Sequence, residues 1–375
     1  MSKSKAVKTN KVNTAKYFDY FMVGLIMLLL AFGLVMLYSA SSYTASMRHG
    51  SALYFVRKQV IYSAIGFVLM LGISMVDYHF WTSTSKWMYG VALILCIYVI
   101  FKGAAWNNSA RWISLKFVSI QPSEIGKIAC ILLNAYLISK YTFRYRHMKD
   151  RLMTLGIAMV PTGIMTVLVA VSNLSTALII LMLSMIMYFV AYPNSKIFIL
   201  MLAGVAAIGV LFLSLASYRS TRIKIWHHPE DFKEGYQTMQ GLYAIGSGGI
   251  FGKGLGSSLQ KKFVPEAQND MIFTLICEEL GMLGAVVLIL MYILLLWRMF
   301  KIANLAKDKV GSFVAIGVMA HIALQVGLNI AVATNSIPNT GVTLPFISAG
   351  GSSLWMLMFE LGIVLNVSRS ARFDD

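Results

Sequence analysis

Residues 235–284 read GYQTMQGLYAIGSGGIFGKGLGSSLQKKFVPEAQNDMIFTLICEELGMLG, and they separate two groups of apolar runs. A connection of this length inside a compact protein is usually functional or disordered. Its glycines cluster between Gly246 and Gly256 and are interleaved with apolar residues such as Ile250 and Phe251. This pattern predicts a tightly turned, packed loop. The loop delivers one carboxylate, Asp270, to the start of the next apolar run.

The composition of the whole chain predicts a membrane protein. Of its 375 residues, 58% are hydrophobic, and the mean hydropathy is +0.71, which is more apolar surface than one soluble core can bury. Lys and Arg total 32 against 15 Asp and Glu, as expected where a protein meets anionic headgroups or substrates. No basic face or aromatic RNA-binding motif occurs, so nucleic acid is not an expected partner. Three cysteines in or beside apolar runs predict small core residues and no disulfide framework.

Windows of about 20 apolar residues predict an all-α polytopic integral membrane protein with about ten transmembrane helices. The windows lie near residues 18–40, 56–76, 87–101, 122–140, 152–171, 174–191, 197–217, 271–297, 311–332 and 348–367. The positive-inside rule places the lysine-rich tail, 1–17, in the cytoplasm, and an even helix count returns the tail at 369–375 to the same side. The single membrane domain is then 18–368, with a large extracellular loop, 218–270, between the seventh and eighth helices. That loop is itself basic, which contact with lipid phosphates or with an anionic substrate would explain.

Two roles are open for Asp270 from its position alone. A carboxylate directly before Met271 can cap the following helix by accepting its backbone N–H groups. A carboxylate at the membrane boundary, at the end of a glycine-bent loop, is also well placed as a general base. The two roles are compatible.

Polar residues inside apolar runs are costly, so they mark structural or functional contacts. Glu124 and Lys127, three residues apart in the fourth predicted helix, can pair on one helix face. A polar stripe recurs every fourth residue of the ninth predicted helix, at His321, Gln325 and Asn329. Such a stripe either forms hydrogen bonds between helices or lines a cavity. Glu360 lies inside the tenth predicted helix, and we expect His321 as its partner.

Two further patterns imitate binding sites. GSGGIFGKGLG, residues 246–256, resembles a phosphate-binding loop, but Ser247 and Gly254 stand where the nucleotide motif requires Gly and Ser or Thr. Residues 227–234 contain histidines and acids that could ligate a metal, but adjacent histidines point in different directions and the ligand spacing does not recur. We therefore expect no nucleotide site, and a solvated loop in place of a metal site.

Five segments carry a resemblance to a known family. They read SARWISLKFVSIQPSEIGK (109–127), YAIGSGGIFGKGLG (243–256), VPEAQNDMIF (264–273), EELG (278–281) and TLPFISAGGSS (343–353). In this order they resemble the SEDS family of bacterial membrane proteins (shape, elongation, division and sporulation), over nearly the whole chain. The resemblance implies a ten-helix glycosyltransferase of the cytoplasmic membrane with its active site facing outside. It would polymerise lipid II, an undecaprenyl-pyrophosphate-linked disaccharide peptide, into peptidoglycan strands with a class B penicillin-binding protein.

The resemblance also suggests residue roles. Asp270 falls on the aspartate of the family's PEAHTD-like motif, which implies an inverting reaction with an Asp general base. Gln268 and Asn269 replace the common His and Thr of that motif. Asn173 stands where Asp is common, and Ala349 replaces a frequent Tyr. The sequences GSGGIFGKGLG and EAQND resemble the FtsW and SpoVE branch of the family more than RodA.

A lipid pyrophosphate is already a good leaving group, so one base and nearby cations could suffice for the transfer. The expected substrate contacts are Arg111, Lys127, Arg219 and Lys253, with the acids Glu124 and Glu266. A divalent cation could replace some of these basic residues, and no other cofactor or metal is expected. Two other functions stay open: a flippase for the lipid-linked precursor would depend on charges in the bilayer interior, and a noncatalytic scaffold for cell-wall enzymes would tolerate their loss. A role in division, elongation or sporulation is not distinguished by the sequence.

Overall fold

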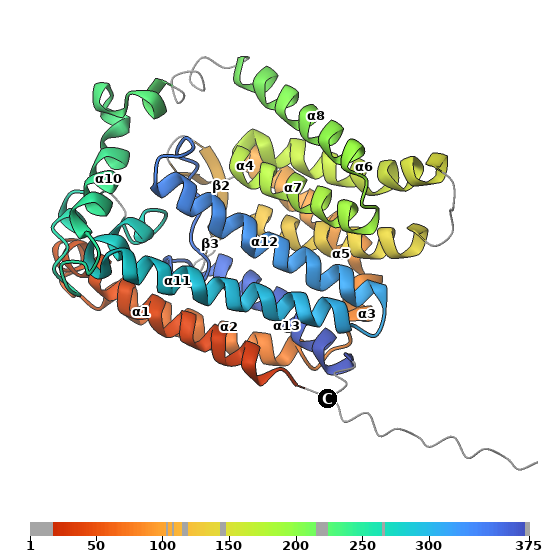
Figure 1. Cartoon of the computed structure of the whole chain (residues 1–375), viewed down its shortest axis with the longest axis horizontal. Helices are drawn as coiled ribbons and strands as arrows, with labels where there is room; N and C mark the ends of the chain where they lie inside the picture. The colour runs from red at the N-terminus through yellow and green to blue at the C-terminus, as the bar shows by residue number, and fades with distance from the viewer. Residues whose placement is uncertain are drawn as a thin grey trace, which may run out of the picture.

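The computed structural model describes residues 18–102, 104–106, 109–114, 119–142, 148–214, 224–264 and 267–371. Long helices run side by side as a bundle, and residues 224–264 and 267–271 gather at one end of it (Figure 1). We call this end the loop face. The other end, the opposite face, carries Asp19 before α1, the short helix α3 (Tyr78–Ser83) and the last residues of α13.

Each of the ten predicted apolar runs forms a helix. These helices are α1 (Tyr20–His49), α2 (Tyr54–Ile73), α4 (Ser85–Lys102), α5 (Pro122–Thr142), α6 (Met148–Ser172), α7 (Leu174–Ala191), α8 (Ser195–Ser214), α11 (Ile272–Leu305), α12 (Lys309–Ala333) and α13 (Ser352–Ser370). The start of α1 has a regular cap, because the Asp19 carboxylate accepts a hydrogen bond from the N–H of Met22 at 2.9 Å. Its end at Gly50 is left-handed, with φ 69°, as is common where glycine terminates a helix.

Seven of the described helices are long and apolar enough to cross a membrane: α1, α2, α4, α6, α7, α11 and α12. The outer surface of the bundle is apolar as well. Trp87 and Phe101 of α4 are each 80% exposed, and Leu200 of α8 is 72% exposed. Large apolar side chains exposed in this number are stable in lipid and not in water. The chain is therefore a helical polytopic membrane protein.

A small sheet at the loop face adds to the predicted helical fold. Its strands are β1 (Ala104–Trp106), β2 (Ser109–Ser114) and β3 (Ser119–Ile120), antiparallel and in the order β1-β2-β3. Ala105 pairs with Ala110, and Ile113 pairs with Ile120. The connection from α4 to α5 lies beside the membrane, where unpaired backbone groups are costly, and hairpin pairing satisfies them. The apolar windows could not reveal this pairing, because the strands are too short.

The predicted loop 218–270 is largely structured where it is described. It contains helix α10 (Tyr236–Gly248) and three short 3-10 turns at Pro229–Asp231, Lys233–Gly235 and Gln260–Lys262. α10 packs against α11 through a face of small residues that includes Gly241, Ala244 and Gly248. A Cβ on Gly248 would lie 2.0 Å from the carbonyl oxygen of Cys277. Only glycine permits this close approach of the two backbones.

The two ends of the described chain meet at the opposite face. The Asp19 carboxylate accepts a hydrogen bond from Arg298 Nε near the end of α11 at 2.7 Å. The Arg369 guanidinium of α13 lies 4.9 Å from the centre of the Phe18 ring. The start of α1 is thus fixed to the ends of α11 and α13.

A second contact at the opposite face joins the α2–α3 connection to the α11–α12 connection. The His79 ring lies between two carboxylates, with Nδ1 2.7 Å from Asp77 and Nε2 2.8 Å from Asp308. Burial raises the pKa of Asp308, but hydrogen bonds from Gly311 N–H and the Tyr78 hydroxyl, together with His79, outweigh it and hold that pKa below its ordinary value. Asp308 is also the N-cap of α12.

Candidate functional site

Asp270 lies at the loop face, where α10, α11 and α12 meet. Gln237 Nε2 of α10 donates a hydrogen bond to its Oδ1 at 3.2 Å. Asn329 Nδ2 of α12 donates to its backbone carbonyl at 2.8 Å. The N-cap of α11 is Met271, which makes no side-chain cap. The predicted capping role of Asp270 is therefore wrong, and its half-buried carboxylate is oriented by tertiary contacts instead.

The second glycine-bearing loop, between α12 and α13, is attached to the Asp270 segment. Asn329 Nδ2 also donates to the carbonyl of Val342 at 2.7 Å, so one amide contacts both segments. The N–H of Ala349 donates to the carbonyl of Gln268 at 2.9 Å. A Cβ on Gly341 would lie 3.8 Å from Asp270 Oδ2. The absence of a side chain at Gly341 thus leaves room beside the carboxylate.

The glycine-rich loop is held against α11 by a buried carboxylate. Glu278 is fully buried, and it accepts hydrogen bonds from Lys253 Nζ at 2.9 Å, from the Ser258 hydroxyl, and from the N–H groups of Leu259 at 3.1 Å and Gln260 at 3.3 Å. Lys253, an expected pyrophosphate contact, is also bonded to Ser247 Oγ at 2.8 Å. In this structure the ammonium group of Lys253 is therefore part of the loop's attachment to α11.

The neighbouring acid, Glu279, connects the same loop to α1. Its two oxygens lie 2.5 and 2.6 Å from the Ser39 hydroxyl, and Oε1 accepts from the N–H of Ser258 at 3.3 Å. Sequence reasoning did not assign a role to either glutamate. The signal was present, because two adjacent acids inside an apolar run are costly to bury and need partners.

A break in α11 receives the glycine-rich loop. Gly281 has φ 67° and ψ −166°, outside the helical region. The N–H groups of Lys253 and Gly254 donate to the carbonyls of Glu278 and Glu279 at 3.0 and 2.9 Å. A Cβ on Gly281 would lie 2.3 Å from the nitrogen of Gly252. The predicted tight turns of the loop are confirmed, and the loop backbone packs on the backbone of α11. The predicted packing of its apolar side chains is not, because Ile250 and Phe251 are 55% and 79% exposed.

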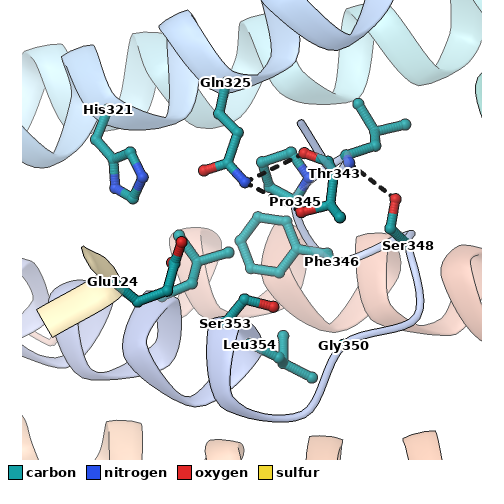
Figure 2. Close-up of a pocket in the computed structure, with 12 residues that line it drawn as sticks. Glu124, His321, Gln325, Thr343, Pro345, Phe346, Ser348, Gly350, Ser353 and Leu354 are labelled. Carbon is teal, nitrogen blue, oxygen red and sulfur yellow. Dashed lines mark hydrogen bonds between the residues drawn. The ribbon is translucent and has the colours of Figure 1, made fainter. Parts of the chain in front are cut away.

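A small polar cavity lies further inside the bundle, between α5, α12 and α13. Its volume is about 20 Å³, enough for a single water molecule. Figure 2 shows His321 and Gln325 projecting from α12 on one side, with Glu124 and Ser353 on the other. Gln325 Nε2 donates to the carbonyl of Thr343 at 3.1 Å. Asn329, which donates to the Asp270 carbonyl, follows Gln325 by about one helical turn of α12, or about 6 Å along the helix. The cavity therefore lies deeper in the bundle than Asp270.

Two buried pairs of ionisable residues lie next to this cavity, and both were expected from the sequence. Lys127 Nζ and Glu124 Oε1 are 3.0 Å apart. His321 Nδ1 and Glu360 Oε2 are 2.7 Å apart. Nε2 of His321 is buried without a hydrogen-bond partner among the described residues. The polar stripe of α12 therefore both bonds to neighbouring segments and lines a cavity.

Two further residues singled out from the sequence contact the turn between α6 and α7. Arg111 Nε, in β2, donates to the carbonyl of Ser172 at the end of α6 at 2.8 Å. Asn173 caps α7 by accepting from Thr176 N–H at 3.2 Å, a role that the family's Asp could also fill. Arg219 and Glu266 lie outside the described residues.

The histidine-containing segment before α10 could hold a metal ion only at the surface. Ligand atoms of His228, Glu230 and Asp231 lie within 4.8 Å of one another, and all three residues are exposed. Hydrogen bonds from its own N–H and from His228 hold the pKa of Glu230 below its ordinary value. The contact between His228 and Glu230 satisfies both groups without a metal.

This architecture defines a class: a polytopic membrane protein that presents one carboxylate between two loops at one end of its bundle, with buried pairs of ionisable residues deeper in the bundle. The profile of the cell cycle protein family FtsW/RodA/SpoVE matches residues 19–373. The chain belongs to this family, the SEDS family, as the resemblance predicted.

Two relatives match this chain over nearly their full length. Stage V sporulation protein E of Bacillus subtilis is 38% identical over 362 residues, covering 95% of this chain and 98% of the relative. A probable peptidoglycan glycosyltransferase FtsW of Trichlorobacter lovleyi is 37% identical, covering 94% and 93%. The chain is therefore a homologue of probable peptidoglycan glycosyltransferases, and similarity to SpoVE and FtsW agrees with the predicted branch.

Solved structures share the fold. A chain of a peptidoglycan synthase complex that coordinates polymerization and crosslinking has a TM-score of 0.80 and 25% identity, covering 95% of this chain and 99% of its own. The rod shape determining protein RodA of Thermus thermophilus has a TM-score of 0.70 and 24% identity, covering 98% and 100%.

Proposed function

We propose that the protein is a peptidoglycan glycosyltransferase that polymerises lipid II into glycan strands. The oxygen of an acceptor sugar's 4-hydroxyl attacks C1 of the donor sugar, and the bond from C1 to the lipid pyrophosphate breaks. Asp270 takes the hydroxyl proton as general base, and the configuration at C1 inverts. The observation that carries the proposal is the placement of Asp270 between the two loops, fixed through Gln237 and Asn329.

The proposed topology has ten membrane spans, with both termini in the cytoplasm and the loop face outside. It adds α5, α8 and α13 to the seven helices that meet the length and hydropathy criteria. The N-terminal lysines and the contact of Phe18 with Arg369 of α13 support a shared cytoplasmic side for both ends. The active site then faces the outer surface of the bacterial cytoplasmic membrane, where lipid II is exposed.

Cations near the loop face would stabilise the departing pyrophosphate. We propose Arg111, Lys127, Arg219 and Lys253 for this role, with Glu124 orienting Lys127 and Glu266 contacting substrate. Lys253 and Lys127 are already paired with Glu278 and Glu124, so either would have to exchange a carboxylate for a phosphate oxygen. A divalent cation could neutralise part of the same charge.

A class B penicillin-binding protein is the proposed partner. The likeness to a chain of a synthase complex that coordinates polymerization and crosslinking supports this choice, because a growing glycan strand must be crosslinked after it is polymerised. The partner would supply the transpeptidation step.

A flippase is the second candidate, and the buried pairs Glu124–Lys127 and His321–Glu360 are the observation that favours it. The cavity between these pairs has a volume of only about 20 Å³. It cannot admit a lipid-linked disaccharide in this conformation, whereas Asp270 at the loop face needs no passage through the bundle. We therefore prefer the polymerase.

The test is lipid II polymerisation by the purified full-length protein, with and without the penicillin-binding partner. Asp270→Asn should lower the rate by about 10²–10⁴-fold, as expected for loss of a general base. Asp231→Asn is the matched control, because it makes the same change at an exposed carboxylate of the same loop. A near-normal rate for Asp270→Asn would refute the base assignment. Loss of lipid transport in Glu124→Gln, with polymerisation retained, would favour the flippase.

A further inference from the structure

Two large apolar side chains of the glycine-rich loop, Ile250 and Phe251, are exposed on the surface of the protein. Large apolar side chains that lie side by side on a surface are unfavourable in water and mark a place that meets lipid or another molecule. The loop follows α10 and packs on the backbone of α11. Its depth relative to a membrane can therefore be worked out from α11.

The loop is attached to α11 at a fixed level. The N–H groups of Met282 and Leu283 donate to the carbonyls of Gly249 and Ile250 at 2.9 and 3.1 Å. Met282 and Leu283 are themselves exposed apolar residues on the outer surface of the bundle. The apolar surface of α11 thus continues onto the loop at this level.

The other end of this apolar surface is marked by Trp297. Lys301 Nζ lies 3.9 Å from the centre of its ring, and a Trp beside a cation is typical of a membrane–water boundary. The helix between Trp297 and Met282 is about 22 Å long, whereas the hydrocarbon core of a bilayer is about 30 Å thick. The level of Met282 is then about 8 Å inside the second boundary, or about 3 Å if Phe300 marks the first one. Any tilt of α11 would place the loop deeper.

The neighbouring helix α1 indicates a similar level. Its exposed apolar residues include Phe21, whose ring centre lies 5.6 Å from the Arg298 guanidinium of α11, and Tyr43. About 33 Å of helix separate Phe21 from Tyr43, close to the thickness of the hydrocarbon core. Lys262, which follows the glycine-rich loop, has its Nζ 5.7 Å from the centre of the Tyr43 ring. Tyrosine and lysine are expected at the level of the lipid headgroups.

The backbone of the loop suits this depth. Irregular backbone is tolerated inside a membrane only where the protein itself satisfies the polar groups. The N–H groups of Lys253 and Gly254 donate to carbonyls of α11, and the N–H of Gly252 donates to the carbonyl of Gly248 at 2.9 Å. The ammonium group of Lys253 is paired with Glu278. Polar groups of the loop therefore contact α11, while Ile250 and Phe251 are exposed.

We propose that Ile250 and Phe251 insert into the outer leaflet and anchor the glycine-rich loop to the membrane. Lipid acyl chains are the occupant, because the two side chains continue the apolar surface of α11 at a depth within the hydrocarbon core. The leaflet follows from the proposed topology, whereas the insertion does not depend on the proposed reaction. The anchor would fix the height of the loop face above the membrane.

The first experiment measures the surroundings of residue 251 by electron paramagnetic resonance. The full-length protein carries Cys96→Ala/Cys130→Ala/Cys277→Ala, which removes its three buried thiols, and a nitroxide attached at Phe251→Cys. In nanodiscs of phosphatidylglycerol and phosphatidylcholine, we expect relaxation of the nitroxide by oxygen, which is concentrated in the acyl region. A water-soluble nickel chelate should have little effect.

Two labelled positions serve as references. Val287→Cys lies on the exposed apolar surface of α11, and Asp231→Cys lies on an exposed acidic turn. Accessibility at residue 251 like that at residue 287 supports the proposal. Accessibility like that at residue 231 would show contact with water and overturn it. Low access of both reagents would show that another protein chain covers the loop, which would overturn it as well.

The second experiment tests the anchoring by amide hydrogen exchange in the same nanodiscs. Phe251→Ser should accelerate exchange of the Lys253 and Gly254 amides by roughly 30-fold, the equivalent of about 2 kcal/mol for one phenylalanine side chain leaving an apolar environment. Because the ring is 79% exposed, contacts within the protein account for little of this effect. Phe251→Leu, which stays apolar, should exchange as the wild type does.

The matched control is Tyr236→Ser, which removes an exposed aromatic ring at the other end of α10. Exchange at Lys253 and Gly254 should be unchanged in this variant. The unfolding temperature of each variant shows that it remains folded. Wild-type exchange in Phe251→Ser, or equal acceleration in Phe251→Ser and Phe251→Leu, would contradict anchoring by an apolar side chain.

Discussion

Glu278→Gln should detach the glycine-rich loop from α11. The substitution keeps the size of the side chain but removes the charge that pairs with Lys253. It also places an NH₂ group, itself a donor, next to the N–H groups of Leu259 and Gln260, which then lack an acceptor. Loss of one partner of a buried charged pair costs about 3–5 kcal/mol. Because Lys253 is 30% exposed and can be partly hydrated, we take the lower value of about 3 kcal/mol, equivalent to roughly 100-fold in the opening equilibrium.

Amide hydrogen exchange in nanodiscs measures this opening directly. The N–H groups of Lys253 and Gly254 are bonded to carbonyls of α11, so their exchange should accelerate by about 100-fold in Glu278→Gln. Amides in the middle of α12 should exchange as in the wild type. Glu230→Gln is the matched control, because this acid is exposed and its carboxylate contacts His228, away from the glycine-rich loop. Unchanged exchange at Lys253 and Gly254 in Glu278→Gln would refute the assignment of Glu278 as the residue that holds the loop.

Three further predictions concern single positions. Gly281→Ala should destabilise the protein by about 2 kcal/mol or more in thermal unfolding, since φ is 67° and the added Cβ would lie 2.3 Å from the nitrogen of Gly252. Gly24→Ala is the control, because the space around Gly24 is open and no such loss of stability is expected. Asn329→Ala removes two hydrogen bonds worth about 1 kcal/mol each, so polymerisation should fall about 10-fold or more, and a normal rate would contradict its role in positioning Asp270. Asp308→Ala should lower the unfolding temperature at pH 7. Because the pKa of Asp308 in the folded protein is lowered from 3.8, the difference in unfolding temperature between wild type and variant should shrink as the pH falls below about 3.8. A difference that does not change with pH would exclude a contribution from protonation of Asp308.

The sequence predicted the features that depend on local spacing or on overall apolarity. The ten apolar runs form helices because lipid requires about 20 apolar residues for each span. The Glu124–Lys127 pair is visible as an i, i+3 spacing, and the His321–Glu360 pair follows from the need of buried ionisable groups for partners. Membership of the SEDS family was predicted from motifs in their order and was confirmed.

The contacts that the sequence could not reveal join distant segments. Glu279 contacts Ser39 across 240 positions, and Asn329 contacts Asp270 across 59. Neither separation leaves a periodic signal. Capping of α11 was one of two roles left open for Asp270, but Met271 takes the N-cap position. The strands at residues 104–120 were missed because hydropathy windows detect spans and not short hairpins.

The break at Gly281 has a consequence for chimeric proteins. The glycine-rich loop and the first turns of α11 recognise each other through backbone groups, with the loop filling the space that a side chain at Gly281 would take. Because Lys253 pairs with Glu278 and Gly252 meets Gly281, a transplanted loop should function only with an EELG segment that matches it at these two contacts. We expect the two segments to be exchangeable only as a pair, although some twenty residues separate them in the chain.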